Sequence, residues 1–143
     1  MTSRPTTVSA DLELRLVVPG SASLPVLASI RYVLDDPYAV HVTFHTGGER
    51  GTVDWSFARQ LLTDGLTQAT GEGDVRVWPS HLGGHATVFL SLSSPSGQAV
   101  FEVGLHELAE YLTQSYTLVP TGCESDFVDI DAELALLLWT DSE

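Results

Sequence analysis

The chain has 143 residues, enough for one domain with a hydrophobic core. It carries 19 acidic residues against six arginines and no lysine, a formal net charge of −13. Such a charge repels the phosphates of nucleic acids and the surfaces of anionic lipids, and so argues against both as partners. With 43% hydrophobic and 17% charged residues, the composition is that of a globular domain and excludes a disordered chain.

The sequence shows no pattern typical of a membrane-spanning helix or of a signal peptide. No apolar stretch approaches the roughly 20 residues of a membrane-spanning helix, and the polar first residues contain no signal peptide. The one cysteine, Cys123, cannot form an internal disulfide, so we expect a cytoplasmic protein without a transmembrane anchor. No repeat or linker divides the chain. We therefore expect a polar N-terminal lead over residues 1–8 and a single domain over residues 9–143.

Apolar and polar residues alternate with a period of two through the first two-thirds of the chain, which predicts antiparallel strands. These predicted strands span residues 8–18, 24–32, 40–44, 53–57, 75–78, 86–92 and 98–103. A short helix is predicted over residues 56–66, where Ala58, Leu61 and Leu62 have helical spacing. Gly65 suits the position just after such a helix.

Two further helices are predicted, over residues 105–116 and 129–139, and they complete an α+β fold built on an antiparallel meander. The last helix is apolar on two sides, and its second stripe includes Leu136 and Trp139. One side of it faces either a second subunit or the sheet of its own chain. In the first case, Leu136 and Trp139 are the expected oligomer interface.

No arrangement of residues predicts catalysis, a metal or a cofactor. His41 and His45 lie on a predicted strand, where four residues separate them by roughly 13 Å, too far to share one ion. His81 and His85 have no third ligand nearby, and Cys123 stands beside an acid that would raise its pKa. Motifs for a nucleophile elbow, a phosphate-binding loop or a dinucleotide site are missing. We expect a binding or assembly protein, not an enzyme, and no cofactor.

Seven segments nevertheless resemble the SsgA-like proteins of sporulating actinomycetes, most closely the SsgB type. The most specific are DPYAVHVTFHTG over residues 36–47 and GEGDVRVWPS over residues 71–80. The others cover residues 14–18, 23–26, 55–62, 92–97 and 131–138. The resemblance implies a whirly-like fold assembled as a homotrimer. It also implies a non-enzymatic protein of sporulation-specific cell division that recruits the tubulin-like protein FtsZ to future septum sites, with an SsgA-type partner, and supports ring assembly. A single-stranded nucleic-acid-binding protein of whirly-like fold is the alternative, and the net charge argues against it.

The charge is divided unevenly, and this suggests where a partner binds. Residues 1–76 hold nine acids and all six arginines, a net charge of −3, whereas residues 77–143 hold ten acids and no arginine. FtsZ proteins are usually acidic, so contact through the arginine-bearing part avoids repulsion. Arginine and large aromatic residues are also the most frequent hot spots of protein interfaces. The expected partner-binding residues are Arg31, Tyr38, Arg59, Arg76 and Trp78.

Overall fold

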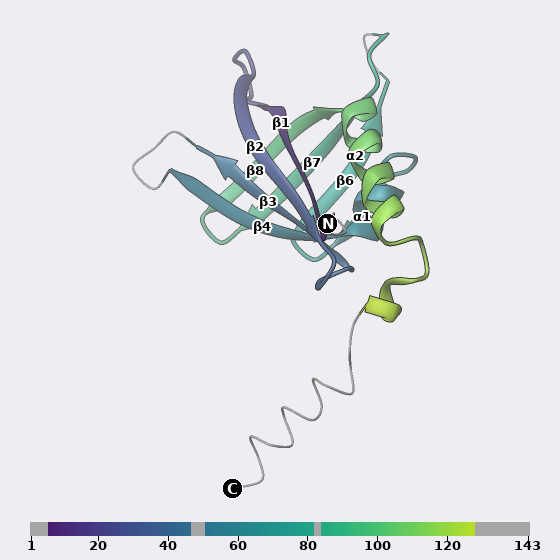
Figure 1. The fold of residues 1–143 in the computed structure, drawn as a ribbon. Helices are drawn as coiled ribbons and strands as arrows, with labels where there is room; N and C mark the ends of the chain where they lie inside the picture. Colours follow the sequence, from purple (N-terminus) through teal and green to yellow (C-terminus); the bar gives the residue numbers. More distant parts are fainter. Residues whose placement is uncertain (1–5, 47–50, 82–83, 128–143) are drawn as a thin grey trace, which may run out of the picture.

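A computed structural model describes residues 6–46, 51–81 and 84–127, and all structural statements below concern these ranges. They contain eight strands, two α-helices and a short 3₁₀ helix (Figure 1). The strands are β1 (Thr7–Leu16), β2 (Leu24–Val33), β3 (Ala39–His45), β4 (Thr52–Ala58), β5 (Thr70–Glu72), β6 (Val75–Ser80), β7 (Thr87–Ser94) and β8 (Gly97–Gly104). The helices are α1 (Arg59–Asp64), α2 (Leu105–Leu118) and the 3₁₀ helix η2 (Glu124–Phe127).

All eight strands belong to one antiparallel sheet with the order β4-β3-β2-β1-β8-β7-β6-β5. The predicted antiparallel meander is thereby confirmed, with one addition. Residues 70–72, for which no strand was predicted, form the short edge strand β5 against β6. Consecutive strands pair within β1–β4 and within β5–β8, whereas β4 and β5 lie at opposite edges of the sheet. The two halves are joined by β1 and β8, where Arg15 lies opposite Glu102 and Leu16 lies opposite Phe101.

The sheet is curled, so that its two halves enclose one core. Phe44 of β3 stacks on Phe101 of β8 with ring centroids 4.7 Å apart, although β2 and β1 separate these strands in the sheet. We call the side of the sheet that carries these rings the inner face and the opposite side the outer face. Buried inner-face residues come from both halves, and they include Leu14, Ile30, Val42, Val77 and Leu90. The alternation of the sequence supplies this face from every long strand.

The helices cover the open side of this curled sheet (Figure 1). The predicted helix over residues 105–116 is confirmed as α2, and Leu108 and Leu112 bury its apolar stripe. The helix predicted over residues 56–66 begins later, at Arg59, because the strand alternation continues through Ala58, which pairs with Ala39. The helix predicted over residues 129–139 lies outside the described residues, as do Leu136 and Trp139.

Candidate partner-binding surfaces

The outer face of β1–β4 carries a hydrogen-bonded polar row that includes both strand histidines. His41 lies between Asp36 and Ser56, with its Nε2 2.9 Å from the Asp36 carboxylate and its Nδ1 2.9 Å from the Ser56 hydroxyl. His45 instead contacts the hydroxyl of Ser29 at 2.9 Å. The two histidines therefore contact different side chains, in keeping with their predicted separation along a strand. Within the described residues, no group of three metal-ligating side chains comes together.

Arg31 and Tyr38 are exposed near this row. Arg31 lies on β2 directly opposite His41 of β3, so its position continues the row across the outer face. Tyr38 precedes β3 and is 55% exposed. A partner in solution can therefore reach both side chains, as is necessary for partner-binding residues.

Arg76 and Trp78 lie on β6, in the other half of the sheet. Their side chains alternate with the buried Val75 and Val77, so they belong to the outer face. Arg76 is exposed, while Trp78 is half-buried and stacks on Phe89 of β7 with ring centroids 5.6 Å apart. This stacked pair gives the outer face a rigid aromatic element beside a cation. Since β6 and β2 are separated by three strands, these four candidates form two surfaces instead of one.

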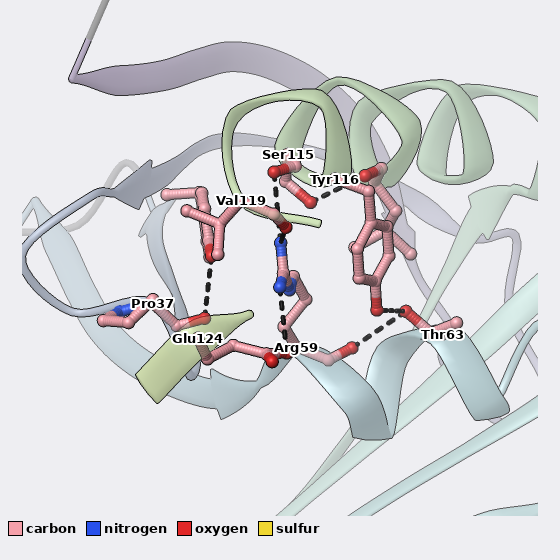
Figure 2. A network of polar contacts seen from close by, with 9 residues as sticks. Pro37, Arg59, Thr63, Ser115, Tyr116, Val119 and Glu124 are labelled. Atoms are coloured by element: carbon pink, nitrogen blue, oxygen red, sulfur yellow. Dashed lines mark hydrogen bonds and ion pairs between the residues drawn. The ribbon is translucent and has the colours of Figure 1, made fainter. Parts of the chain in front are cut away.

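Arg59 is not a surface residue, and its predicted role as an exposed partner contact is wrong. It is the first residue of α1, and only 1% of its surface is exposed. Its Nη1 donates to the carbonyls of Ser115, at 3.1 Å, and Val119, at 2.9 Å, at the end of α2. Its Nη2 forms an ion pair with Glu124 at 3.0 Å (Figure 2). The guanidinium thus supplies a donor to the Val119 carbonyl just after α2 and a second donor to the Ser115 carbonyl, which also accepts the Val119 N–H at 2.9 Å.

Two tyrosine rings complete the surroundings of this guanidinium. The guanidinium carbon lies 4.0 Å from the centroid of Tyr116 and 4.6 Å from that of Tyr32, both within cation–π distance. The Tyr116 hydroxyl is 2.6 Å from the Thr63 hydroxyl, and the Tyr32 hydroxyl donates to the Pro37 carbonyl at 2.8 Å. Burial raises the pKa of Tyr32 to about 12, so this donor stays protonated. We call Arg59, its two tyrosines and Glu124 the Arg59 cluster.

The Arg59 cluster makes stability depend on pH through Glu124. Hydrogen bonds from its own backbone N–H and from Arg59, together with the charge of Arg59, lower the pKa of this carboxyl although desolvation opposes them. A lowered pKa means that the carboxylate's stabilisation is complete above the unfolded-state pKa and is lost as pH falls through the folded-state pKa.

We therefore expect Glu124→Gln to destabilise the protein at about pH 7 and to cost progressively less toward about pH 3. Urea unfolding of both proteins across this range measures the difference. Glu110→Gln, at an exposed acid of α2 for which the structure gives no ion pair, is the matched control. A cost of Glu124→Gln that does not change with pH would contradict the assignment.

No helix in the described ranges is long and apolar enough to cross a membrane.

The sequence offered no signal for the burial of Arg59, because its partners lie 56 to 65 residues further along the chain.

Comparisons with known proteins give these surfaces a context. Residues 26–124 match the family described as Streptomyces sporulation and cell division protein, SsgA. The chain is similar to sporulation-specific cell division protein SsgB of Frankia casuarinae, with 52% identity over 97% of this chain and 96% of the relative. SsgB of Streptomyces coelicolor is 52% identical over 93% of this chain and 96% of its own length. A crystal structure of an SsgA-like sporulation-specific cell division protein from Thermobifida fusca matches with a TM-score of 0.84 and 48% identity, over 96% of this chain and 100% of that one.

Proposed function

This chain belongs to the SsgA family of sporulation and cell division proteins, and from that membership we propose that it recruits FtsZ to future septum sites. In this proposal the protein is a non-enzymatic scaffold in the cytoplasm at the division septum. It supports assembly of the FtsZ ring together with an SsgA-type partner. It acts as a homotrimer whose interface includes Leu136 and Trp139, which lie beyond the described residues.

One observation carries the proposal, namely 52% identity to an SsgB protein across 97% of the chain. Similarity over nearly the whole length means that the entire domain, and not one motif, is shared with proteins named for sporulation-specific cell division. The net charge of −13 gives no support to the nucleic-acid alternative, because a binder of phosphate chains needs a basic surface.

Co-sedimentation with FtsZ polymers tests the proposal. We expect the protein to pellet with FtsZ in the presence of GTP and to remain in the supernatant when FtsZ is omitted. If the protein stays in the supernatant at every FtsZ concentration, the recruitment proposal is wrong. Filter binding of single-stranded DNA at low salt tests the alternative on the same preparation.

Charge reversal at an exposed arginine is expected to weaken this association. Arg31→Glu or Arg76→Glu replaces a cation by an anion on a surface that we propose meets an acidic protein, so each should lower apparent affinity by about three- to tenfold. The measurement is the pelleted fraction against FtsZ concentration. Glu72→Arg is the control, because Glu72 is exposed on the neighbouring strand but lies opposite Val75, on the other face of the sheet from Arg76, so its reversal should leave pelleting unchanged. Equal losses in all three variants would exclude a specific role for the arginines.

A further inference from the structure

The two edges of the sheet differ in a way that bears on partner binding. Natural sheets protect their edges with very short strands, prolines, bulges or charged side chains, above all lysine, because an open edge pairs with any available strand. The edge strand β5 follows this rule, with only three residues and Gly71 at its centre. The opposite edge, β4, has seven residues, TVDWSFA, with no proline or glycine and with Asp54 as its one charged residue. Among the described residues, β4 is therefore the longer and less protected edge.

The register of β4 shows which backbone groups this edge offers. Beyond the two ends of the strand, Thr46 donates to Gly51 at 3.0 Å and Arg59 donates to Tyr38 at 2.8 Å. Hydrogen-bonded and non-hydrogen-bonded pairs alternate in an antiparallel ladder, so Val53 and Trp55 direct their backbone groups toward β3. Thr52, Asp54 and Ser56 direct theirs away from the sheet. In the part of the chain that the structure describes, these outward groups accept and donate no backbone hydrogen bond.

An apolar groove lies on the inner side of this edge. It has a volume of about 360 Å³ and separates the β3–β4 hairpin from the β7–β8 hairpin. Its apolar lining includes Phe44, Val53, Trp55, Leu92, Ala99 and Phe101. Val53, at its wall, is 43% exposed, an unusual degree for a valine on the inner face. A strand added beside β4 would place every second side chain next to Val53 and Trp55 and bury them further.

The outer side of the same edge carries an acid. The Asp54 carboxylate accepts a hydrogen bond from Thr43 at 2.7 Å, and no ion pair with it occurs among the described residues. Opposite charges stabilise directly facing residues of paired strands, whereas like charges destabilise them. A second copy of β4 paired antiparallel over its whole length would set Asp54 against Ser56, so each carboxylate would face a hydroxyl and the Asp54 carboxylate of the other copy would be its diagonal neighbour. The edge therefore suits a segment with lysine or arginine at this position better than it suits a copy of itself.

We propose that β4 binds an extended segment of FtsZ as a ninth strand of the sheet. The segment alternates apolar residues, which enter the groove beside Val53 and Trp55, with polar residues that include a lysine or arginine facing Asp54. Main-chain hydrogen bonds to Thr52, Asp54 and Ser56 supply affinity, and the groove and the carboxylate supply selectivity. The inference rests on the proposed function for the identity of the partner and adds the mode of binding.

Amide hydrogen exchange of the full chain, with and without FtsZ, gives a direct test. Exchange of the Asp54 and Ser56 amides should slow by about tenfold or more when FtsZ binds, while the Val53 and Trp55 amides, already bonded to β3, should change little. If FtsZ co-sediments but no such alternation develops along β4, the binding mode is wrong and the recruitment proposal stands. If FtsZ does not bind, both are wrong. If the alternation develops in the protein alone as its concentration rises, a second copy occupies the edge and the inference is overturned.

Substitutions of Asp54 distinguish the contribution of its backbone N–H to FtsZ binding from the contribution of its charge. Asp54→Pro removes an N–H that points away from β3 and leaves the β3–β4 ladder intact, a change that edge strands tolerate. It should weaken FtsZ binding by about tenfold or more, whereas Asp54→Asn, which keeps the N–H, should weaken it by about two- to fivefold. A folded Asp54→Pro protein that binds as well as the unmodified chain overturns the inference. If Asp54→Pro does not fold, Asp54→Lys decides, since unchanged affinity after this reversal has the same meaning.

Discussion

Replacing Arg59 with methionine is expected to lower the free energy of unfolding by about 3–5 kcal/mol. Methionine fills much of the volume but offers no donors, so the Val119 carbonyl loses its Arg59 donor and Glu124 loses its ion pair, while the Ser115 carbonyl keeps only the Val119 N–H. Buried polar groups left without a partner carry most of this cost. Urea unfolding at neutral pH measures it. Arg31→Met is the matched control, and because Arg31 is exposed it should change stability by no more than about 0.5 kcal/mol.

A second variant shows whether the loss of stability comes from the polar groups that no longer have Arg59 as a partner. In the double variant Arg59→Met with Glu124→Met, the carboxylate no longer requires a cation, so the cost should be smaller than the sum of the two single costs. Additive costs, or a loss below about 1 kcal/mol for Arg59→Met alone, would mean that the Arg59 cluster contributes little to stability. In either case, Arg59→Glu is unsuitable as a probe of a binding surface, because it would place an anion beside Glu124 in the interior.

Gly65→Ala is expected to lower the free energy of unfolding by about 1–3 kcal/mol. The backbone of Gly65 has φ −66° and ψ −13°, a conformation that alanine adopts readily, so helix propensity alone predicts a gain of about 1 kcal/mol. The space is the obstacle, because an added Cβ would lie 2.7 Å from the Cβ of the fully buried Val77 and overlap its Cγ1. Thermal unfolding followed by circular dichroism distinguishes the two expectations by the sign of the change.

The same collision predicts a smaller cost in a second background. Val77→Ala alone leaves a cavity and should destabilise the protein, but it removes Cγ1, the atom closest to the added Cβ, while the Cβ of residue 77 remains 2.7 Å away. Gly65→Ala should therefore lower stability less in the Val77→Ala background than in the unmodified chain. If Gly65→Ala costs the same in both backgrounds, contact with the Val77 methyl group is not the reason for glycine at this position.

Some of the candidate binding residues were predictable because exposure follows from local alternation. Arg76 and Trp78 share strand β6 with Val75 and Val77, and their outward position follows from the period of two once those valines are assigned to the core. The same reasoning predicted that His41 and His45 lie too far apart along a strand to share one ion. The edge formed by β4 was not predictable in this way, because which strand lies at the border depends on the order of all eight strands.

Arg59 shows most clearly what local sequence patterns do not predict. Its neighbours in the sequence place it at the start of a short amphipathic helix, where an arginine is ordinarily exposed. Its burial requires the end of α2, two tyrosine rings and Glu124, which reach it only when the chain is folded. Gly65 follows α1 as predicted, but its close packing against Val77 could not be predicted for the same reason, since Val77 belongs to another element.

The sequence by itself determined every strand except β5, the α2 helix, the negative charge and its uneven division, and the resemblance that names the family. These properties depend on composition and on periodicities of two and 3.6 residues, which act over one element at a time. Only the tertiary structure decided that the sheet curls until Phe44 meets Phe101, that Arg59 is interior, and that β4 is an edge of the sheet. These three outcomes depend on contacts between residues far apart in the chain, and such contacts leave no local pattern.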